Sequence, residues 1–323
     1  MKYSEAAGLR LSSIGLGCWQ FGSSDWGYGK RYGETTAIEL VHRALDLGIN
    51  LLDTAEIYAR GASEAIVGRA LEGRRDEAFV ATKVFPIWPT ASRVEEHGRL
   101  SALRIGVQQL DLYQVHWPNP AVPLRSTMAG MRRLQDEGIV DHVGVSNFSA
   151  QRWEAAEHAL GRPVASNQVH FSLLQRKPDR DNVPYAQRND RMVIAYSPLG
   201  QGVLGGRYDA KNPPRGSARR MHPLCLPENL DRATPVIETL RRVARSHDAT
   251  PAQAALAWLI SKPNVVVMPG ASSVEQLESN VAAADLDLSD AEIDELTTVS
   301  DDFSPIGGPA TGMALLRERR RAA

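Results

Sequence analysis

Cysteine and paired metal ligands are scarce in this sequence. Only Cys18 and Cys225 occur among the 323 residues, and the eight histidines form no His-x-His or His-x-x-x-His pair. Two lone cysteines cannot build a disulfide framework, and their spacing is not that of a zinc site. We therefore expect no metal ion and a reducing, cytoplasmic environment.

Long apolar runs and an excess of charge are also missing. The longest apolar stretches, such as Ala254 to Ile260, fall far short of the ~20 residues that a membrane helix needs. The 37 Lys and Arg nearly cancel the 38 Asp and Glu, so the chain has no large positive net charge that would attract nucleic acid or an anionic membrane. We expect neither partner and read the basic stretch 317–321 as a solvated tail. The oligomeric state is left open, a monomer included.

A third absence concerns nucleotide binding. No Gly-x-Gly-x-x-Gly motif opens a helix after the first expected strand, which argues against a Rossmann dehydrogenase. Hydrophobic residues make up 43% of the chain and charged residues 23%, an ordinary globular balance. Since α/β barrels commonly exceed about 250 residues as one unit, residues 1–323 are expected to form one domain.

Eight short apolar segments rich in β-branched residues are spaced along the chain, most of their starts about 25 to 35 residues apart. They are residues 14–16, 50–52, 79–81, 112–115, 140–145, 165–169, 192–195 and 265–268. Helical patterning separates many of them, at residues 35–47, 63–71, 126–137, 149–160 and 250–260. This alternation predicts an α/β fold with a parallel sheet, and eight units favour a single closed (β/α)8 TIM barrel.

Some segments fall outside the alternation. Residues 2–11, with Gly8 at the turn, are expected to form an N-terminal hairpin that plugs the barrel floor. Long loops are expected after strands 4 and 7, the latter from Leu199 to Leu230, and such loops are usually functional. The core then covers about residues 9–299, and residues 300–323 form a C-terminal tail.

Polar side chains follow three neighbouring strands of the expected barrel. Asp53 follows residues 50–52, Lys83 follows the next strand and His116 the one after, while Tyr58 lies on the loop beyond Asp53. Active sites of these barrels lie at the carboxyl ends of the strands, so the four groups should meet there. Lys83, paired with Asp53, is expected to lower the pKa of the Tyr58 phenol, and His116 to fix the geometry. Together they form a candidate proton donor.

The same motifs resemble the sequence signature of aldo-keto reductases of the bacterial type, in family order and spacing over residues 9–299. The matching segments are residues 48–58 with 61–64, 81–83, 114–118, 144–148, 167–168, 195–200 and 269–272 with Gln276 and Asn280. The resemblance implies an NADP(H)-dependent oxidoreductase that reduces an aldehyde or ketone to an alcohol. It makes Tyr58 the general acid, completed by Lys83, Asp53 and His116.

The resemblance also implies a cofactor site. Ser146, Asn147 and Gln168 would hold the nicotinamide carboxamide and Tyr196 would stack on its ring, while Trp19 and Trp117 would line a substrate pocket. The full set of expected cofactor contacts is Gly17, Cys18, Trp19, Asp53, Ser146, Asn147, Gln168, Tyr196, Ser197, Leu199, Arg207, Gly270, Ser272, Gln276 and Asn280. Cys18 stands where many relatives have Thr, and Ser272 where many bacterial relatives have Arg.

Two alternatives stay open at this point. Lys83 at a strand end could form a Schiff base with a carbonyl substrate, as in barrel lyases. The segment Gly270-Ala271-Ser272 also resembles potassium-channel β subunits, which act largely as non-catalytic, cofactor-sensing partners. Borohydride trapping on Lys83 separates the first alternative from a reductase.

Overall fold

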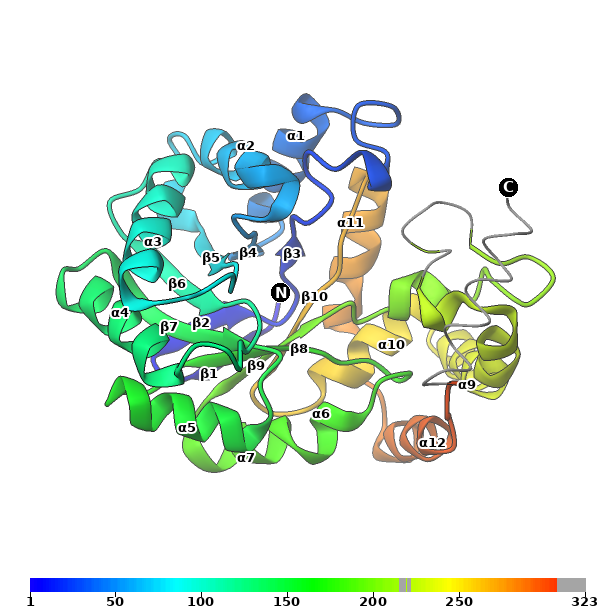
Figure 1. Cartoon of the computed structure of the whole chain (residues 1–323). Helices are drawn as coiled ribbons and strands as arrows, with labels where there is room; N and C mark the ends of the chain where they lie inside the picture. Colours follow the sequence, from blue (N-terminus) through cyan, green and yellow to red (C-terminus); the bar gives the residue numbers. More distant parts are fainter. Residues whose placement is uncertain (215–218, 220–221, 307–323) are drawn as a thin grey trace, which may run out of the picture.

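The computed structural model describes residues 1–214, 219 and 222–306, and its centre is an eight-stranded parallel sheet with strands in sequence order (Figure 1). The strands are β3 (Leu16–Gly17), β4 (Leu51–Asp53), β5 (Phe79–Val84), β6 (Leu110–Val115), β7 (Val140–Ser146), β8 (Ser166–His170), β9 (Met192–Tyr196) and β10 (Val265–Met268). Each contains or adjoins one of the eight expected segments. The first is shifted, since Ile14 forms only an isolated bridge before β3.

The first and last strands close the sheet into a barrel. Ile14 pairs with Val267 and Gly17 with Gly270 in parallel bridges, and the Gly15 amide donates to the Val267 carbonyl at 2.8 Å. Closure leaves no exposed sheet edge, and every strand points its carboxyl end to the same rim. The TIM barrel prediction is therefore confirmed.

A two-stranded antiparallel hairpin, β1 (Tyr3–Ala6) and β2 (Leu9–Ser12), precedes the barrel as expected. Its buried Leu9 and Leu11 belong to one apolar cluster with inward-facing strand residues such as Leu51 and Ile194. The hairpin thus contributes to the inner core and leaves the carboxyl ends of the strands free for a site.

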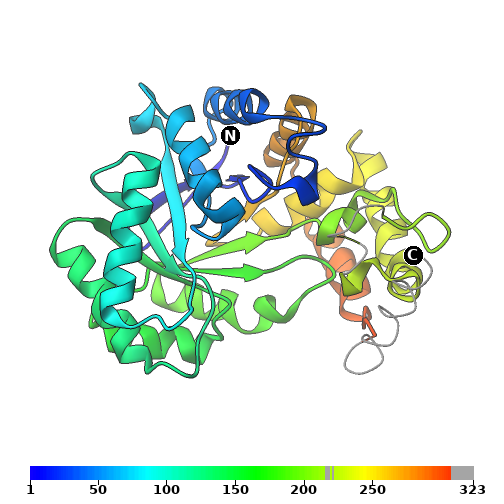
Figure 2. The same ribbon diagram turned by 45° about the horizontal axis from the view of Figure 1, so that its top comes forward.

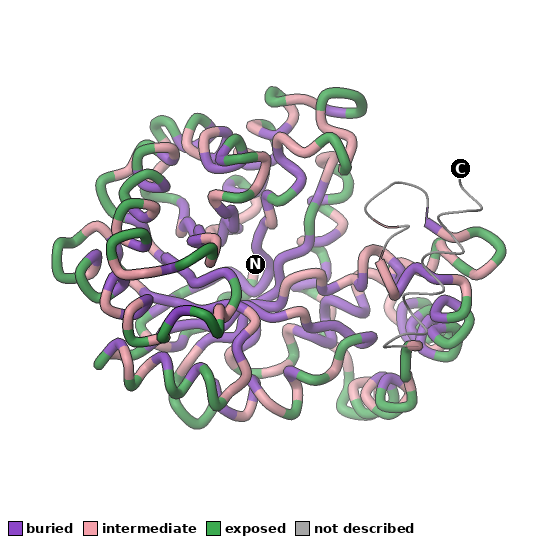
Figure 3. Tube along the Cα trace, viewed as in Figure 1, coloured by how far each residue is buried: buried purple, intermediate pink, exposed green. Residues whose placement is uncertain are grey.

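Helices cover the outside of the strands (Figure 2). They are α1 (Glu34–Asp46), α2 (Ala62–Ala70), α3 (Ala91–Ile105), α4 (Leu124–Asp136), α5 (Ala150–Leu160), α6 (Lys177–Arg180), α7 (Asn182–Asn189), α9 (Pro227–Ser246), α10 (Pro251–Ile260), α11 (Val274–Val281) and α12 (Asp290–Asp301). Short 3-10 turns include η1 (Ser24–Trp26), η2 (Tyr58–Gly61), η3 (Arg75–Glu77), η4 (Gly200–Gly205), η5 (Pro223–Cys225) and η6 (Ala282–Asp285). Figure 3 shows the strands buried and the outer helix faces exposed.

Six of the described helices lie outside the five expected helical segments, namely α3, α6, α7, α9, α11 and α12. Helix α3 carries no strong apolar stripe, because part of its buried face is made of small residues such as Gly98 and Ala102. Helix α9 begins inside the expected loop 199–230, with Pro227 in its first turn, where a proline fits, and Pro235 in its interior.

The connections after β6 and β9 span residues 116–123 and 197–226, and the second includes η4 and η5. Residues 307–323, which contain most of the expected tail, lie outside the described part of the chain. Within the described residues, no helix is both long and apolar enough to span a membrane.

Candidate active site

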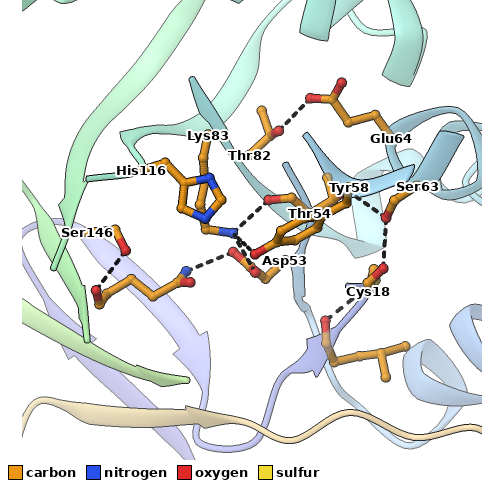
Figure 4. Close-up of polar contacts among 12 residues, drawn as sticks. Cys18, Asp53, Thr54, Tyr58, Ser63, Glu64, Thr82, Lys83, His116 and Ser146 are labelled. Atoms are coloured by element: carbon orange, nitrogen blue, oxygen red, sulfur yellow. Dashed lines mark hydrogen bonds and ion pairs between the residues drawn. The ribbon is translucent and has the colours of Figure 1, made fainter. Parts of the chain in front are cut away.

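Asp53, Lys83 and His116 lie at the carboxyl ends of β4, β5 and β6, and Tyr58 opens η2 on the loop after β4 (Figure 4). The strand register explains why these side chains lie close together, since Asp53 pairs with Ala81 and Lys83 pairs with Gln114. The structure therefore brings the four expected residues together at one rim.

The Lys83 amine is the hub of this cluster. Its Nζ is fully buried and donates to Asp53 Oδ2 at 2.7 Å, to the Thr54 carbonyl at 2.7 Å and to the Tyr58 hydroxyl at 3.3 Å. Burial lowers the pKa of Lys83 and raises the pKa of Asp53, while the charge of each partner opposes the shift of the other. The three acceptors use all three donors of an ammonium group, which fixes its position.

The pKa of Tyr58 is raised, whereas the sequence led us to expect that Lys83 would lower it. Burial, followed by the charge of Asp53, raises this pKa well above its ordinary value. Asp53 lies beside Lys83, so the carboxylate offsets the field of the ammonium at the phenol. Tyr58 therefore keeps its proton over the physiological pH range, as a proton donor requires.

His116 is a neutral ring beside the tyrosine. Burial, followed by the charge of Lys83, lowers the pKa of His116 to about 2. Its ring stacks on Trp117 at 3.9 Å between centroids and meets Tyr58 edge-on at 5.7 Å. Within the described residues no hydrogen bond joins the two side chains, and the buried His116 Nδ1 has no hydrogen-bond partner.

The residues expected to hold the nicotinamide form one hydrogen-bonded group. Ser146 Oγ donates to the Gln168 carbonyl at 2.9 Å, and Asn147 Nδ2 donates to Ser146 Oγ at 3.0 Å. The Tyr196 hydroxyl donates to Asn147 Oδ1 at 2.9 Å. Gln168 Nε2 donates to Asp53 Oδ1 at 2.8 Å, a contact that the sequence did not indicate. This hydrogen bond connects the expected cofactor residues to Asp53, one of the four residues of the candidate proton donor.

The expected contacts after β9 lie on a connection with unusual backbone geometry. Ser197 has φ of 49°, and its hydroxyl accepts from Gln201 Nε2 at 3.2 Å. Leu199 precedes η4. Arg207 is exposed, with its guanidinium 6.0 Å from the ring of Tyr208.

The last group lies between β10 and α11. Ser272 donates to Gln276 Oε1 from its amide at 2.9 Å and its hydroxyl at 3.0 Å, while Asn280 is buried on α11. Across the closing seam, Gly17 pairs with Gly270, and Cys18 follows with its thiol buried. Gln20, which the sequence analysis missed, ties the two sides together by donating to the Ala271 carbonyl at 2.8 Å.

Aromatic rings flank Tyr58 on both sides. Trp19 and Trp117 are 47% and 41% exposed, and one face of the Trp117 indole is covered by the stacked His116 ring. Trp19 lies 6.3 Å from Tyr58 and 5.1 Å from Trp26, and Trp117 lies 5.8 Å from Phe85. Phe85 also meets the His116 ring edge-on at 6.2 Å, and the sequence analysis did not single it out because it directly follows an apolar strand.

No group of three or more metal-ligating side chains occurs in the described ranges 1–214, 219 and 222–306.

The model of the aldo/keto reductase family matches residues 13–301. An uncharacterized oxidoreductase from Mycobacterium bovis is 51% identical over 320 residues, 99% of both chains. A thermostable aldo-keto reductase solved with the inhibitor epalrestat has 30% identity and a TM-score of 0.78, covering 93% of this chain and 100% of that one. An aldo-keto reductase from Klebsiella pneumoniae solved with NADPH has 28% identity and a TM-score of 0.74, covering 93% and 96%.

Proposed function

Because the chain belongs to the aldo/keto reductase family, we propose that it reduces an aldehyde or ketone to an alcohol with NADPH as the reductant. The observation that carries the proposal is the placement of Lys83 Nζ, 2.7 Å from Asp53 and 3.3 Å from the Tyr58 hydroxyl. A protonated phenol beside a fixed cation is suited to give a proton to a carbonyl oxygen.

The donor set at the rim supports a nicotinamide cofactor. Ser146, Asn147 and Gln168 offer a hydroxyl and two primary amides, which match a neutral carboxamide in donors and acceptors. Tyr196 adds a half-buried ring for stacking. NADPH in the Klebsiella pneumoniae relative supports the same cofactor here. The cytoplasmic location stays a prediction that rests on the cysteine content.

The reaction balances as one hydride and one proton. NADPH, when bound, supplies the hydride that forms the new C–H bond at the carbonyl carbon. Tyr58 gives its proton to the carbonyl oxygen, and the product leaves as an alcohol. Lys83 stabilises the negative charge left on Tyr58, which solvent later reprotonates. The neutral His116 ring retains one N–H, which can orient the carbonyl oxygen.

The surroundings of Lys83 favour this role over a Schiff base. A nucleophilic amine must lose its proton and reach the substrate, whereas Lys83 is fully buried and donates to three acceptors. Borohydride with substrate should therefore leave no adduct on Lys83. A covalent adduct without NADPH consumption would favour the lyase. The relatives supply no observation that favours a non-catalytic, cofactor-sensing role.

The proposal is tested with aldehydes, ketones and quinones, scored by loss of NADPH absorbance, for wild type and Tyr58→Phe. The variant keeps the ring and deletes the proton. We expect turnover to fall by the ~10²–10⁴-fold typical of a lost general acid, with NADPH affinity nearly unchanged. Wild-type turnover in Tyr58→Phe, measured with a substrate that the wild type reduces, would contradict the assignment.

A further inference from the structure

The segment that carries Tyr58 has a strained backbone. Ala59 has φ of 48° and Arg60 has φ of 57°, so two consecutive non-glycine residues occupy the left-handed region. Such residues persist only where their surroundings hold them in place. Because the strained residues Ala59 and Arg60 directly follow Tyr58, we expect contacts on both sides of the segment 57–63 to hold this backbone in place.

One restraint precedes Tyr58. Glu56, two residues earlier, is 9% exposed at its side chain and accepts from the Phe85 amide at 2.5 Å. Its other oxygen contacts His97 Nδ1 at 2.6 Å, and Arg104 lies 3.8 Å from that oxygen. The carboxylate thereby ties the start of the segment to the end of β5 and to α3.

The other restraint follows the strained residues. Glu64, in the first turn of α2, is fully buried at its side chain. It accepts from Thr82 Oγ1 at 2.6 Å and from Arg104 Nε at 2.5 Å. Thr82 directly precedes Lys83 on β5, so this carboxylate ties the far end of the segment to the strand that holds the ammonium group (Figure 4).

Arg104 is common to both restraints and lies under the turn itself. A Cβ placed on Gly61 would lie 2.7 Å from Arg104 Cδ and 2.9 Å from its Nε. Gly61 also has φ of 88°, so the turn needs glycine for its conformation and for the close approach of this side chain. The guanidinium thus fills the space beneath the loop and neutralises the buried Glu64.

We propose that Arg104, through Glu56 and Glu64, is a positioning residue that holds the strained segment and keeps the Tyr58 hydroxyl within reach of Lys83. It touches neither the reacting atoms nor the expected cofactor residues. The inference rests on the proposed role of Tyr58, because it assigns Arg104 an effect only through that group. A displacement of about 1 Å at a reacting group can cost on the order of 10²-fold in rate.

The first measurement needs no activity. Amide hydrogen exchange is followed in peptides covering residues 56–63 of wild type, Arg104→Met and Arg69→Met. Arg69, in the last turn of α2, makes an exposed 2.6 Å pair with Glu34 and serves as the control for the loss of an arginine ion pair near this segment. We expect Arg104→Met to speed exchange at Tyr58 and Arg60 at least about 10-fold, and Arg69→Met to leave it unchanged. Unchanged exchange in Arg104→Met would overturn the proposal.

The second measurement separates positioning from general destabilisation. We expect Arg104→Met to lower kcat by about 10²-fold with the NADPH Kd within about twofold of wild type, and Arg104→Lys to recover part of the loss. In a Tyr58→Phe background, Arg104→Met should cause no further loss. An equal loss in both backgrounds would overturn the proposal. If Arg104→Met does not fold, Glu56→Gln takes its place with the same expectations.

These experiments distinguish the two failures. If the wild type reduces none of the carbonyl compounds with NADPH, the proposed function fails, and if Tyr58→Phe keeps wild-type turnover, the proposed role of Tyr58 fails, whatever the exchange data show. If Tyr58→Phe loses turnover but Arg104→Met exchanges and reacts like wild type, the positioning role fails and the proposed function stands.

Discussion

Lys83 combines full burial with three hydrogen bonds, and its value to the site lies in its charge. In the proposed reaction a phenolate would form next to this ammonium when Tyr58 gives up its proton, and the attraction would be strong because little water screens it. The same reasoning assigns Asp53 and Gln168 the task of holding Lys83 in its place.

Lys83→Met tests that assignment. The substitution keeps much of the apolar stem and removes the charge, so the phenolate loses its stabilisation and reduction should slow by about 10²-fold or more. NADPH titration should still give binding, which establishes that the variant is folded. Retained turnover in Lys83→Met would rule out an electrostatic role.

Ser272 bears on the choice between NADPH and NADH. Its side chain is neutral and so offers no positive charge for a 2′-phosphate, and its amide and hydroxyl both donate to Gln276 Oε1. A charge-assisted hydrogen bond is worth about 1.5–3 kcal/mol, so Ser272→Arg should widen the NADPH:NADH affinity ratio by roughly 10- to 150-fold.

Fluorescence titration of both cofactors at fixed salt measures that ratio. Ser92→Arg adds the same charge at an exposed position on α3 and is the control for a non-specific effect. An unchanged ratio in Ser272→Arg would mean that this side chain does not face the phosphate. Tighter binding of NADH than of NADPH by wild type would refute the cofactor assignment.

At the scale of elements, α2 and α3 pack so closely that there is no room for a side chain at position 68 of α2. A Cβ on Gly68 of α2 would lie 2.4 Å from the backbone oxygen of Ile105 at the end of α3. Backbone cannot move aside as a flexible side chain can, so the contact sets the spacing of the two helices. Both helices also carry residues of the restraint around Tyr58, namely Glu64 and Arg104.

Gly68→Ala should therefore lower the free energy of unfolding by about 1–3 kcal/mol, although alanine favours a helix by up to about 1 kcal/mol. Urea unfolding measures the change. Gly33→Ala is the control, because a Cβ there meets no atom within 4 Å and its φ of −131° suits alanine. If Gly68→Ala and wild type have equal free energies of unfolding, α2 and α3 can move apart without cost and the close contact does not fix their spacing.

For the whole molecule, acid should weaken the fold through buried histidines. Burial, followed by the charge of His222, lowers the pKa of His170 to about 4, and its ring stacks on Tyr196 at 5.4 Å. In the unfolded chain His170 has a pKa of about 6.5, so below this pH it binds a proton there while the native His170 stays neutral. Stability therefore falls as pH drops from about 6.5 toward 4, by on the order of 3 kcal/mol from this residue.

Urea unfolding at pH 7.5, 6 and 5 tests this expectation. His170→Phe keeps a stacking ring and removes the titration, so stability should depend less steeply on pH. His158→Asn changes an exposed histidine and should leave the dependence as in wild type. A dependence that His170→Phe does not alter would place the acid sensitivity elsewhere.

The order of the eight strands, five of the helices and the polar residues that end the strands could be predicted from the sequence alone. The hydrophobic periodicity and the spacing of the strand segments favour a barrel, because a parallel sheet whose strands alternate with helices has few ways to bury both of its faces. Asp53, Lys83 and His116 then had to meet at one rim, since each follows a strand of the same direction. Helix α3 escaped this reasoning because small residues such as Gly98 and Ala102 form much of its buried face.

Only the tertiary structure decided the electrostatics and the restraints of the site. The pKa of Tyr58 rises because the phenol is buried and lies near the charge of Asp53, and both causes depend on distances in space that no sequence spacing contains. The contact between Gln168 and Asp53 and the contacts of Arg104 with two carboxylates join residues 40 to 115 positions apart. Such contacts arise from the closure of the barrel and the packing of its helices, because hydrogen bonds form by proximity in space, whereas sequence patterns report only local conformation and burial.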